Sequence, residues 1–475
     1  MSIKSLGKQS LVYGIGHILA RLVTFLLLPL YTNVFTASEY GVVALFYTFL
    51  SFMNVIMRYG LGAAFLKFYV PASDNERNAI FTNVIASLFL TGIPFLLVWH
   101  GFRNLISPII LGINEPSFIS IMGVIIVLDT IWSIPLLGFR AENRPILFII
   151  FSLLNVGITI GLNLFLILKM NMGIRAIFLS NLSASLCIFS LSLPFIYQRF
   201  EFALLDKTRW KSIITFALPF LPAGLFSMAM EVADRYILKY LTDLSTVGIY
   251  NAGYKIGMLM MLAVTAFNFG WQPFFLEQGK GANQEKLFGK VTTLVLAGLG
   301  FIWLILMLWA DDFIQLKIMG YSFFGEEFQN SIPIVPWIAL GYLFYGFYVL
   351  QTPGIFLKNR PGIAAWTRLL GATSNIIFCF IFIPLYGAIG AAMATCLAFF
   401  LMLVMMYWWN TKLYPIRLEW RKISFITIIL ISGFFVSRGS ADNLFINILI
   451  TGLYPIGLIG SGIIKIDSFK SRVAD

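Results

Sequence analysis

Long apolar runs alternate with short polar segments along the whole chain. An apolar run of about 18 residues is long enough to cross a hydrocarbon core of roughly 30 Å as an α-helix. The pattern predicts fourteen such helices and leaves no stretch between them that would form a soluble domain. The predicted spans are residues 10–34, 40–68, 79–98, 117–139, 146–168, 176–197, 212–238, 246–276, 287–310, 331–356, 362–384, 388–410, 423–437 and 444–464.

The composition also indicates an all-α integral membrane protein. Apolar residues make up 59% of the 475 positions and charged residues 11%, against roughly 25% charged in a soluble domain. The basic segment MSIKSLGKQS leads into a run longer than a signal-peptide core, with no cleavage pattern, which predicts a retained first helix. Cys187, Cys379 and Cys396 lie within spans at spacings typical of neither disulfides nor metal sites, so we expect packing roles and no metal or cofactor.

The positive charges predict the orientation of the chain. With the N-terminus in the cytoplasm, 22 of the 33 lysines and arginines fall in cytoplasmic segments and 6 in outer segments. This bias is typical of cytoplasmic loops and places both termini inside. The formal charge of +12 is therefore a result of topology, and it does not indicate nucleic-acid binding.

Two motifs recur at a spacing of about half the chain. Ser38-Glu39-Tyr40-Gly41 opens the second span, and Ser245-Thr246-Val247-Gly248 opens the eighth. Asn143-Arg144-Pro145 precedes the fifth span, and Asn359-Arg360-Pro361 precedes the eleventh. The recurrence predicts two six-helix lobes, and because six is even the lobes form a parallel repeat, with a substrate site expected between them.

The repeat gives the expected domain boundaries. Residues 1–205 form the first lobe, 206–411 the second, and 412–475 two additional helices with a short cytoplasmic tail. The basic segment 197–211 is the expected linker between the lobes.

Charged groups inside spans are costly, at roughly 2.5 to 3.5 kcal/mol each, and usually face a bundle interior or a wet cavity. Most of those here also have a structural explanation. Glu231 and Arg235 are four residues apart and can neutralise each other, Asp234 can join an ion pair at the outer end, and Arg368 can extend to the inner interface. Asp129 can pair with an arginine on another helix or respond to protons, and the sequence does not rank these alternatives. His17, one turn before Arg21, can titrate near neutral pH or serve as a hydrogen-bonding residue.

Arg21, Arg58 and Lys255 have no acidic residue within four positions on their own helices. Arg58 lies nine residues before Lys67, about 13 Å from the inner end of its helix. The three cations also break the repeat, since a shift of 207 residues pairs them with Met228, Thr265 and Thr48. Residues that recur in both halves are expected to build the shared scaffold. Each of these three cations occurs in one half only, so we expect them to line a cavity.

Three segments resemble a known family. ASEYGVVALFYTFLSFMNVIMRYGLGAAFLKFY (37–69) is similar to the second-helix region of polysaccharide transporters in the multidrug/oligosaccharidyl-lipid/polysaccharide exporter superfamily. These are the lipid-linked oligosaccharide flippases of the bacterial O-antigen type. VGIYNAGYK (247–255) and PLYGAIGAAMAT (384–395) look like the corresponding segments of the second half.

The resemblance implies a V-shaped twelve-helix core with two extra helices, and alternating access in the bacterial cytoplasmic membrane. It implies an undecaprenyl diphosphate-linked oligosaccharide as cargo. We expect an ion-coupled cycle, with H⁺ or Na⁺ and polysaccharide polymerase or assembly proteins as further partners, but the sequence does not decide between these ions and the membrane potential as the driving force. It carries a diphosphate-binding role to Arg21, Arg58 and Lys255, on the first, second and eighth spans. The fixed fork of donors on arginine suits phosphate oxygens.

Two other classes of function are alternatives. A multidrug extruder of the same superfamily would be expected to carry acidic rather than cationic cavity residues. A membrane glycan polymerase or glycosyltransferase would need acidic, histidine or metal-binding groups gathered on a sizeable loop. The longest outer loop, residues 310–331, carries four acids but no histidine, which disfavours an enzyme.

Overall fold

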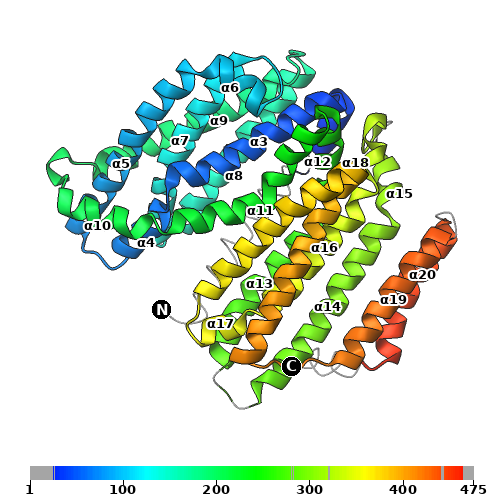
Figure 1. Cartoon of the computed structure of the whole chain (residues 1–475). Helices are drawn as coiled ribbons and strands as arrows, with labels where there is room; N and C mark the ends of the chain where they lie inside the picture. The colour runs from blue at the N-terminus through cyan, green and yellow to red at the C-terminus, as the bar shows by residue number, and fades with distance from the viewer. Residues whose placement is uncertain are drawn as a thin grey trace. The chain divides into compact units, whose positions relative to one another are not determined.

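A computed structural model describes residues 25, 27–279, 281, 283–318, 321–439 and 443–463. Almost all of them are helical (Figure 1). The strands in this part of the chain are a small antiparallel pair, β1 (Lys317–Ile318) with β2 (Tyr321–Ser322). Eleven of the described helical segments are long and apolar enough to cross a membrane, which confirms the all-α, multi-pass fold class.

The chain divides into two compact units, Met1–Gly248 and Ile249–Asp475. The helices that begin in the first unit are α2 (Leu28–Val34), α3 (Ala37–Arg58), α4 (Leu61–Tyr69), α5 (Asp74–Gly101), α6 (Arg103–Ile110), α7 (Pro116–Ala141), α8 (Pro145–Leu168), α9 (Arg175–Arg199), η1 (Phe202–Leu204), α10 (Lys207–Ala217), α11 (Phe220–Leu241) and α12 (Leu244–Gly257). Those of the second are α13 (Leu259–Gln278), α14 (Gln284–Leu308), α15 (Ala310–Gln315), η2 (Glu326–Ser331), α16 (Ile334–Leu350), α17 (Pro353–Leu357), α18 (Gly362–Leu413), α19 (Trp420–Gly439) and α20 (Leu444–Gly460). The lobe boundaries expected from the repeat stay a prediction.

The long helix α18 contains two predicted spans. Its backbone leaves helical geometry at Gly387, where φ is 56° and ψ is −130°, a conformation that favours glycine. The Asn375 side chain donates to the Thr395 hydroxyl at 3.1 Å, so the two halves lie side by side. The halves match the predicted spans 362–384 and 388–410. The total of fourteen stays a prediction, because the first span lies mostly outside the described residues.

Four spans that the sequence predicted as continuous are interrupted, which corrects the prediction. The second span breaks between α3 and α4, the seventh between α10 and α11, the eighth between α12 and α13, and the tenth between α16 and α17. Gly60, at the first break, has φ 81°, and a Cβ there would overlap the carbonyl oxygen of Ala217 at the end of α10. The second and seventh spans therefore meet where each of them breaks.

The sequence repeat has a counterpart in local structure. Asn143 and Asn359 both adopt positive φ, 56° and 52°, at the ends of helices. The residue after each donates to a carbonyl five positions back, Arg144 to Phe139 and Arg360 to Ile355, both at 2.8 Å. The same turn thus occurs 216 residues apart, as the recurring Asn-Arg-Pro motif indicates.

The other recurring motif, at Ser38 and Ser245, also has the same local structure in both halves, because each copy lies at a capped helix start. At the start of α3, the Thr36 hydroxyl accepts from the backbone of Glu39 at 3.3 Å. At the start of α12, the Asp243 carboxylate accepts from the backbone of Thr246 at 2.8 Å. Both pairs are N-caps, which satisfy backbone donors that a helix start leaves unpaired. The caps are 207 residues apart, so the local structure repeats at the spacing of the motif.

The hydrophobic core of the first unit packs α4, α5, α7, α9 and α10 against one another, and α3 packs against α7 and α5. Phe81, Phe139 and Phe195 make edge-to-face contacts within it, with ring centroids 4.9 to 5.6 Å apart. Figure 1 shows α3, α7 and α9 as neighbouring helices. This packing holds the polar residues of α3, α7 and α9 in fixed positions inside an apolar bundle.

Candidate functional site

Arg58 is the last residue of α3 and lies directly before the break in the second span. Tyr59 follows with φ 28° and Gly60 with φ 81°, so the helical hydrogen bonds stop and resume only in α4. The C-terminus of a helix carries a partial negative charge that favours a cation. Interrupted membrane helices are also where transporters of several folds bind their substrates.

Arg58 is partly buried, and its Nε atom is fully buried with no hydrogen-bond partner among the described residues. Asn54, one turn earlier on α3, donates to the Leu50 carbonyl at 2.9 Å, and its own side-chain oxygen is also buried, with no partner in the described part of the chain. A buried donor left unpaired costs about 1 to 3 kcal/mol, and more when it is charged. Such a group is a candidate for binding a ligand oxygen.

Asp129 of α7 faces this part of α3. Its Oδ1 atom accepts from the Ser185 hydroxyl of α9 at 2.6 Å and from the Trp132 indole at 2.9 Å. Arg58 and Asp129 attract each other electrostatically, and the direct ion pairs of the described residues lie elsewhere. We call Asn54, Arg58, Asp129, Trp132 and Ser185 the Arg58–Asp129 cluster.

Three of the four charged residues of α11, Glu231, Asp234 and Arg235, form a local arrangement of their own. Arg235 pairs with the Asp234 carboxylate at 2.8 Å and donates to the backbone carbonyl of Glu231 at 2.6 Å. Asp234 is fully buried and Arg235 is 6% exposed. The expected ion pair of Asp234 is therefore present, and Arg235 meets Glu231 at its backbone.

The other predicted site residues belong to the second unit or lie outside the described residues. Lys255 is partly buried in the last turn of α12, three residues before the break at Met258, so like Arg58 it lies beside an interrupted span. Arg368 is exposed near the start of α18. His17 and Arg21 lie outside the described residues. The cavity role of Arg21, Arg58 and Lys255 together stays a prediction.

A second polar centre, which the sequence did not predict, lies near the predicted cytoplasmic end of the first unit. The Glu142 carboxylate accepts from the Tyr69 hydroxyl at 2.6 Å and pairs with Arg199 at 2.6 Å. Burial and the Glu142 carboxylate raise the pKa of Tyr69 above its usual value. These partners join α4, α9 and the loop after α7, so the centre fastens three helix ends. No local pattern signals it, because its members are far apart in sequence.

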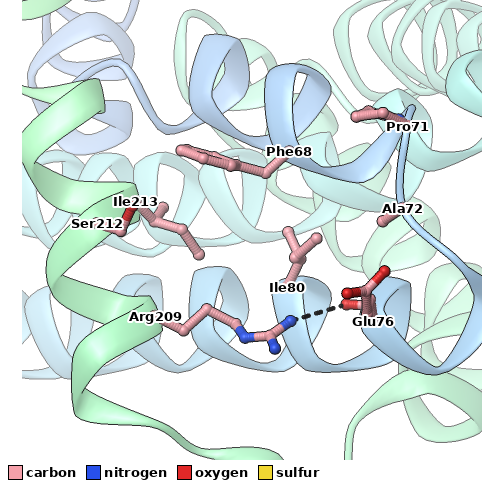
Figure 2. A pocket seen from close by; sticks show the side chains of 8 residues that line it. All are labelled: Phe68, Pro71, Ala72, Glu76, Ile80, Arg209, Ser212 and Ile213. Carbon is pink, nitrogen blue, oxygen red and sulfur yellow. Dashed lines mark hydrogen bonds between the residues drawn. The ribbon is translucent and has the colours of Figure 1, made fainter.

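The pocket in Figure 2 lies beside this centre, between α4, α5 and α10. Its volume is about 320 Å³, and most of its lining side chains are apolar. Arg209 reaches across it and donates to the backbone carbonyl of Glu76 at 3.5 Å (Figure 2). This contact ties α10 to α5, and we assign the pocket no cargo role.

The profile of the polysaccharide biosynthesis protein family matches residues 6–277, more than half of the chain. The chain belongs to this family. The matched part contains Arg58, Asp129 and Lys255, so the Arg58–Asp129 cluster lies inside the region that the family shares.

Two curated relatives are membrane proteins described as uncharacterized. One, from Haemophilus influenzae, is 23% identical over 400 residues, which cover 82% of this chain and 94% of that protein. The other, from Methanocaldococcus jannaschii, is 25% identical over 164 residues, 32% of this chain. The chain matches only 31% of the length of the archaeal protein. Both agree with a multi-pass membrane protein.

Solved structures of two transporter groups share the fold of this family member. The lipid II flippase MurJ, in an inward closed conformation, superimposes with a TM-score of 0.78 at 16% identity, over 96% of this chain and all of that one. An inward-facing multidrug resistance MATE family transporter of the MOP superfamily gives a TM-score of 0.65 at 12% identity, over 87% and 94% of the two chains. At these identities the likeness establishes the fold alone.

Proposed function

We propose that the protein is a flippase that moves an undecaprenyl diphosphate-linked oligosaccharide, a repeat unit of O-antigen or a similar surface polysaccharide, across the bacterial cytoplasmic membrane. The observation that carries the proposal is the buried Nε of Arg58 at the break in the second span, which has no hydrogen-bond partner among the described residues. A diphosphate oxygen would complete its hydrogen bonding, and the guanidinium would offset the phosphate charge.

Membership of the polysaccharide biosynthesis family supports a glycan cargo, and the fold supports transport rather than an enzymatic reaction. The diphosphate and sugars are too polar to cross hydrocarbon unaided, whereas the polyprenyl tail can stay in lipid. Alternating exposure of a site to which Arg21 and Lys255 also contribute would move the head group. H⁺ or Na⁺ coupling and contact with a polysaccharide polymerase belong to the same proposal, with both termini in the cytoplasm.

The alternative is a multidrug extruder, which the likeness to MATE transporters favours. An extruder of cationic compounds would need an unpaired acid in its cavity. Here one intramembrane carboxylate of the first unit, Asp129, already accepts two hydrogen bonds and faces an arginine, and another, Asp234, pairs with Arg235. An anionic cargo fits this arrangement better.

The test is a strain that lacks the protein. Lipid-linked oligosaccharide should accumulate on the cytoplasmic leaflet while surface polysaccharide is lost, and a plasmid copy of the gene should restore both. Unchanged lipid-linked intermediates together with increased sensitivity to cationic drugs would favour the extruder instead.

A further inference from the structure

Asp129 is held asymmetrically by its neighbours. Both of its hydrogen bonds within the described part of the chain, from Ser185 and Trp132, reach Oδ1. Oδ2 accepts neither of these bonds. The carboxylate is therefore fixed in orientation, with one oxygen committed and the other available to accept a proton.

Arg58 is the one charged group acting on Asp129 among the described residues. The other titratable groups on α7 and on the helices packed against it lie at helix ends or are tyrosine or cysteine side chains. They are Glu39, Tyr40, Tyr47, Tyr59, Lys67, Tyr69, Asp74, Glu76, Arg77, His100, Arg103, Arg140, Arg175, Cys187, Tyr197 and Arg199. The charge balance of the cluster thus depends on the pair Arg58 and Asp129. An anion bound to Arg58 would face the carboxylate and repel it.

We infer that Asp129 is the exchangeable counter-ion of Arg58, ionised in the empty protein and protonated when a diphosphate binds. This inference rests on the proposed function and adds proton uptake to it. The proton goes from water to Oδ2, while Oδ1 keeps its bonds from Ser185 and Trp132. Arg58 then compensates one negative charge of the diphosphate. Protonation removes the negative charge of Asp129, which would otherwise repel the diphosphate.

The exchange has a mechanical consequence inside the first unit. Arg58 ends α3, whereas Asp129 and Ser185 belong to α7 and α9. Loss of the carboxylate charge releases the attraction between α3 and α7 at the break of the second span. Binding of the cargo, together with a proton as second ligand, would thus change the contact between α3, at the break of the second span, and the neighbouring helix α7.

The experiment measures proton uptake with the purified full-length protein in detergent. Farnesyl diphosphate is titrated calorimetrically near pH 7 in buffers of different ionisation enthalpy, so that the heats report the protons exchanged per bound diphosphate. The comparison is between the unmodified protein, Asp129→Asn and Asp74→Asn. Asp74 is a matched control because its side chain is 93% exposed at the start of α5.

We expect the unmodified protein and Asp74→Asn to take up about one proton more per diphosphate than Asp129→Asn, because the amide cannot be protonated. Equal proton counts for all three proteins, with binding intact, would overturn this inference and leave the proposed cargo chemistry standing. No binding by the unmodified protein would overturn both.

A second measurement does not depend on the folding of Asp129→Asn. Infrared difference spectra of the unmodified protein should gain a protonated-carboxyl band when farnesyl diphosphate is added, and Asp129→Glu should keep the band at a shifted position. A spectrum without this band, recorded under conditions where binding is seen, contradicts the exchange.

Discussion

Arg58 illustrates how one residue acquires a role from its backbone position. Its charge is beside the carbonyl end of α3, and its counter-charge Asp129 is on another helix. Its Nε is buried and finds no hydrogen-bond partner in the part of the chain that the structure describes. The sequence predicted that Arg58 lines a cavity from its depth and its lack of a local acid. It did not predict the partners Ser185 and Trp132 of Asp129, because those contacts depend on the rotation of α7 against α9.

Gly60, two residues after Arg58, leads to a prediction about the stability of the protein. Gly60→Ala should lower the melting temperature of the purified protein and its level in the membrane, because φ 81° strains alanine and the new Cβ would overlap the Ala217 carbonyl. The positive φ alone costs about 1 to 3 kcal/mol. The control is Gly157→Ala on α8, where a Cβ meets nothing within 4 Å. Equal melting temperatures for the two variants would show that the break is not held by this contact.

At the scale of elements, the apolar pattern predicted the membrane helices but not their interruptions. Residues 362–384 and 388–410 were separated correctly, because Gly387 lies between two long apolar runs. The breaks at Gly60 and Met258 were missed, since a glycine or a methionine inside an apolar run is compatible with a continuous helix. What produces the break at Gly60 is the close approach of Ala217, a tertiary contact that the local pattern cannot reveal.

The last two helices, α19 and α20, lie beside α14 in Figure 1. Tyr454 donates to the Ala297 carbonyl at 2.9 Å, and Asn447 donates to the Leu308 carbonyl at 3.2 Å. Helices α19 and α20 pack against α14, which belongs to the predicted repeat. We therefore expect α19 and α20 to stabilise the fold rather than to select the cargo.

Truncation after Lys412 should therefore reduce the amount of folded protein. Glycan export per remaining molecule, and the type of glycan exported, should be nearly unchanged, as immunoblots of membranes and analysis of surface glycan would reveal. Tyr454→Phe, which removes one hydrogen bond, should have a smaller effect in the same direction. A changed glycan at normal protein level would assign these helices to cargo selection.

At the scale of the whole molecule, the parallel repeat determines which loops share a side of the membrane. The matching turns at Asn143 and Asn359 and the matching caps at Thr36 and Asp243 support the repeat from local structure. The positive charges of the loops predict the side on which each loop lies.

Reporter fusions test this topology. Fusions after Asp74, Arg144, Lys280 and Lys412 should report the cytoplasm, and fusions after Asn114 and Glu327 the outside. Cysteine labelling at the same positions in the full-length protein is the control for truncation effects. An inverted pattern in one half would mean that the lobes are antiparallel and would remove the parallel repeat.

The central claim, that Arg58 binds the diphosphate of the cargo, is tested most directly by glycan export normalised to membrane-inserted protein. Arg58→Ala should abolish export, and Arg58→Lys should retain part of it, because lysine supplies a point charge without the fork of donors. Arg209→Ala, which removes an arginine from the surface pocket of α10, should export normally per molecule. Normal export per molecule by Arg58→Ala would contradict the account.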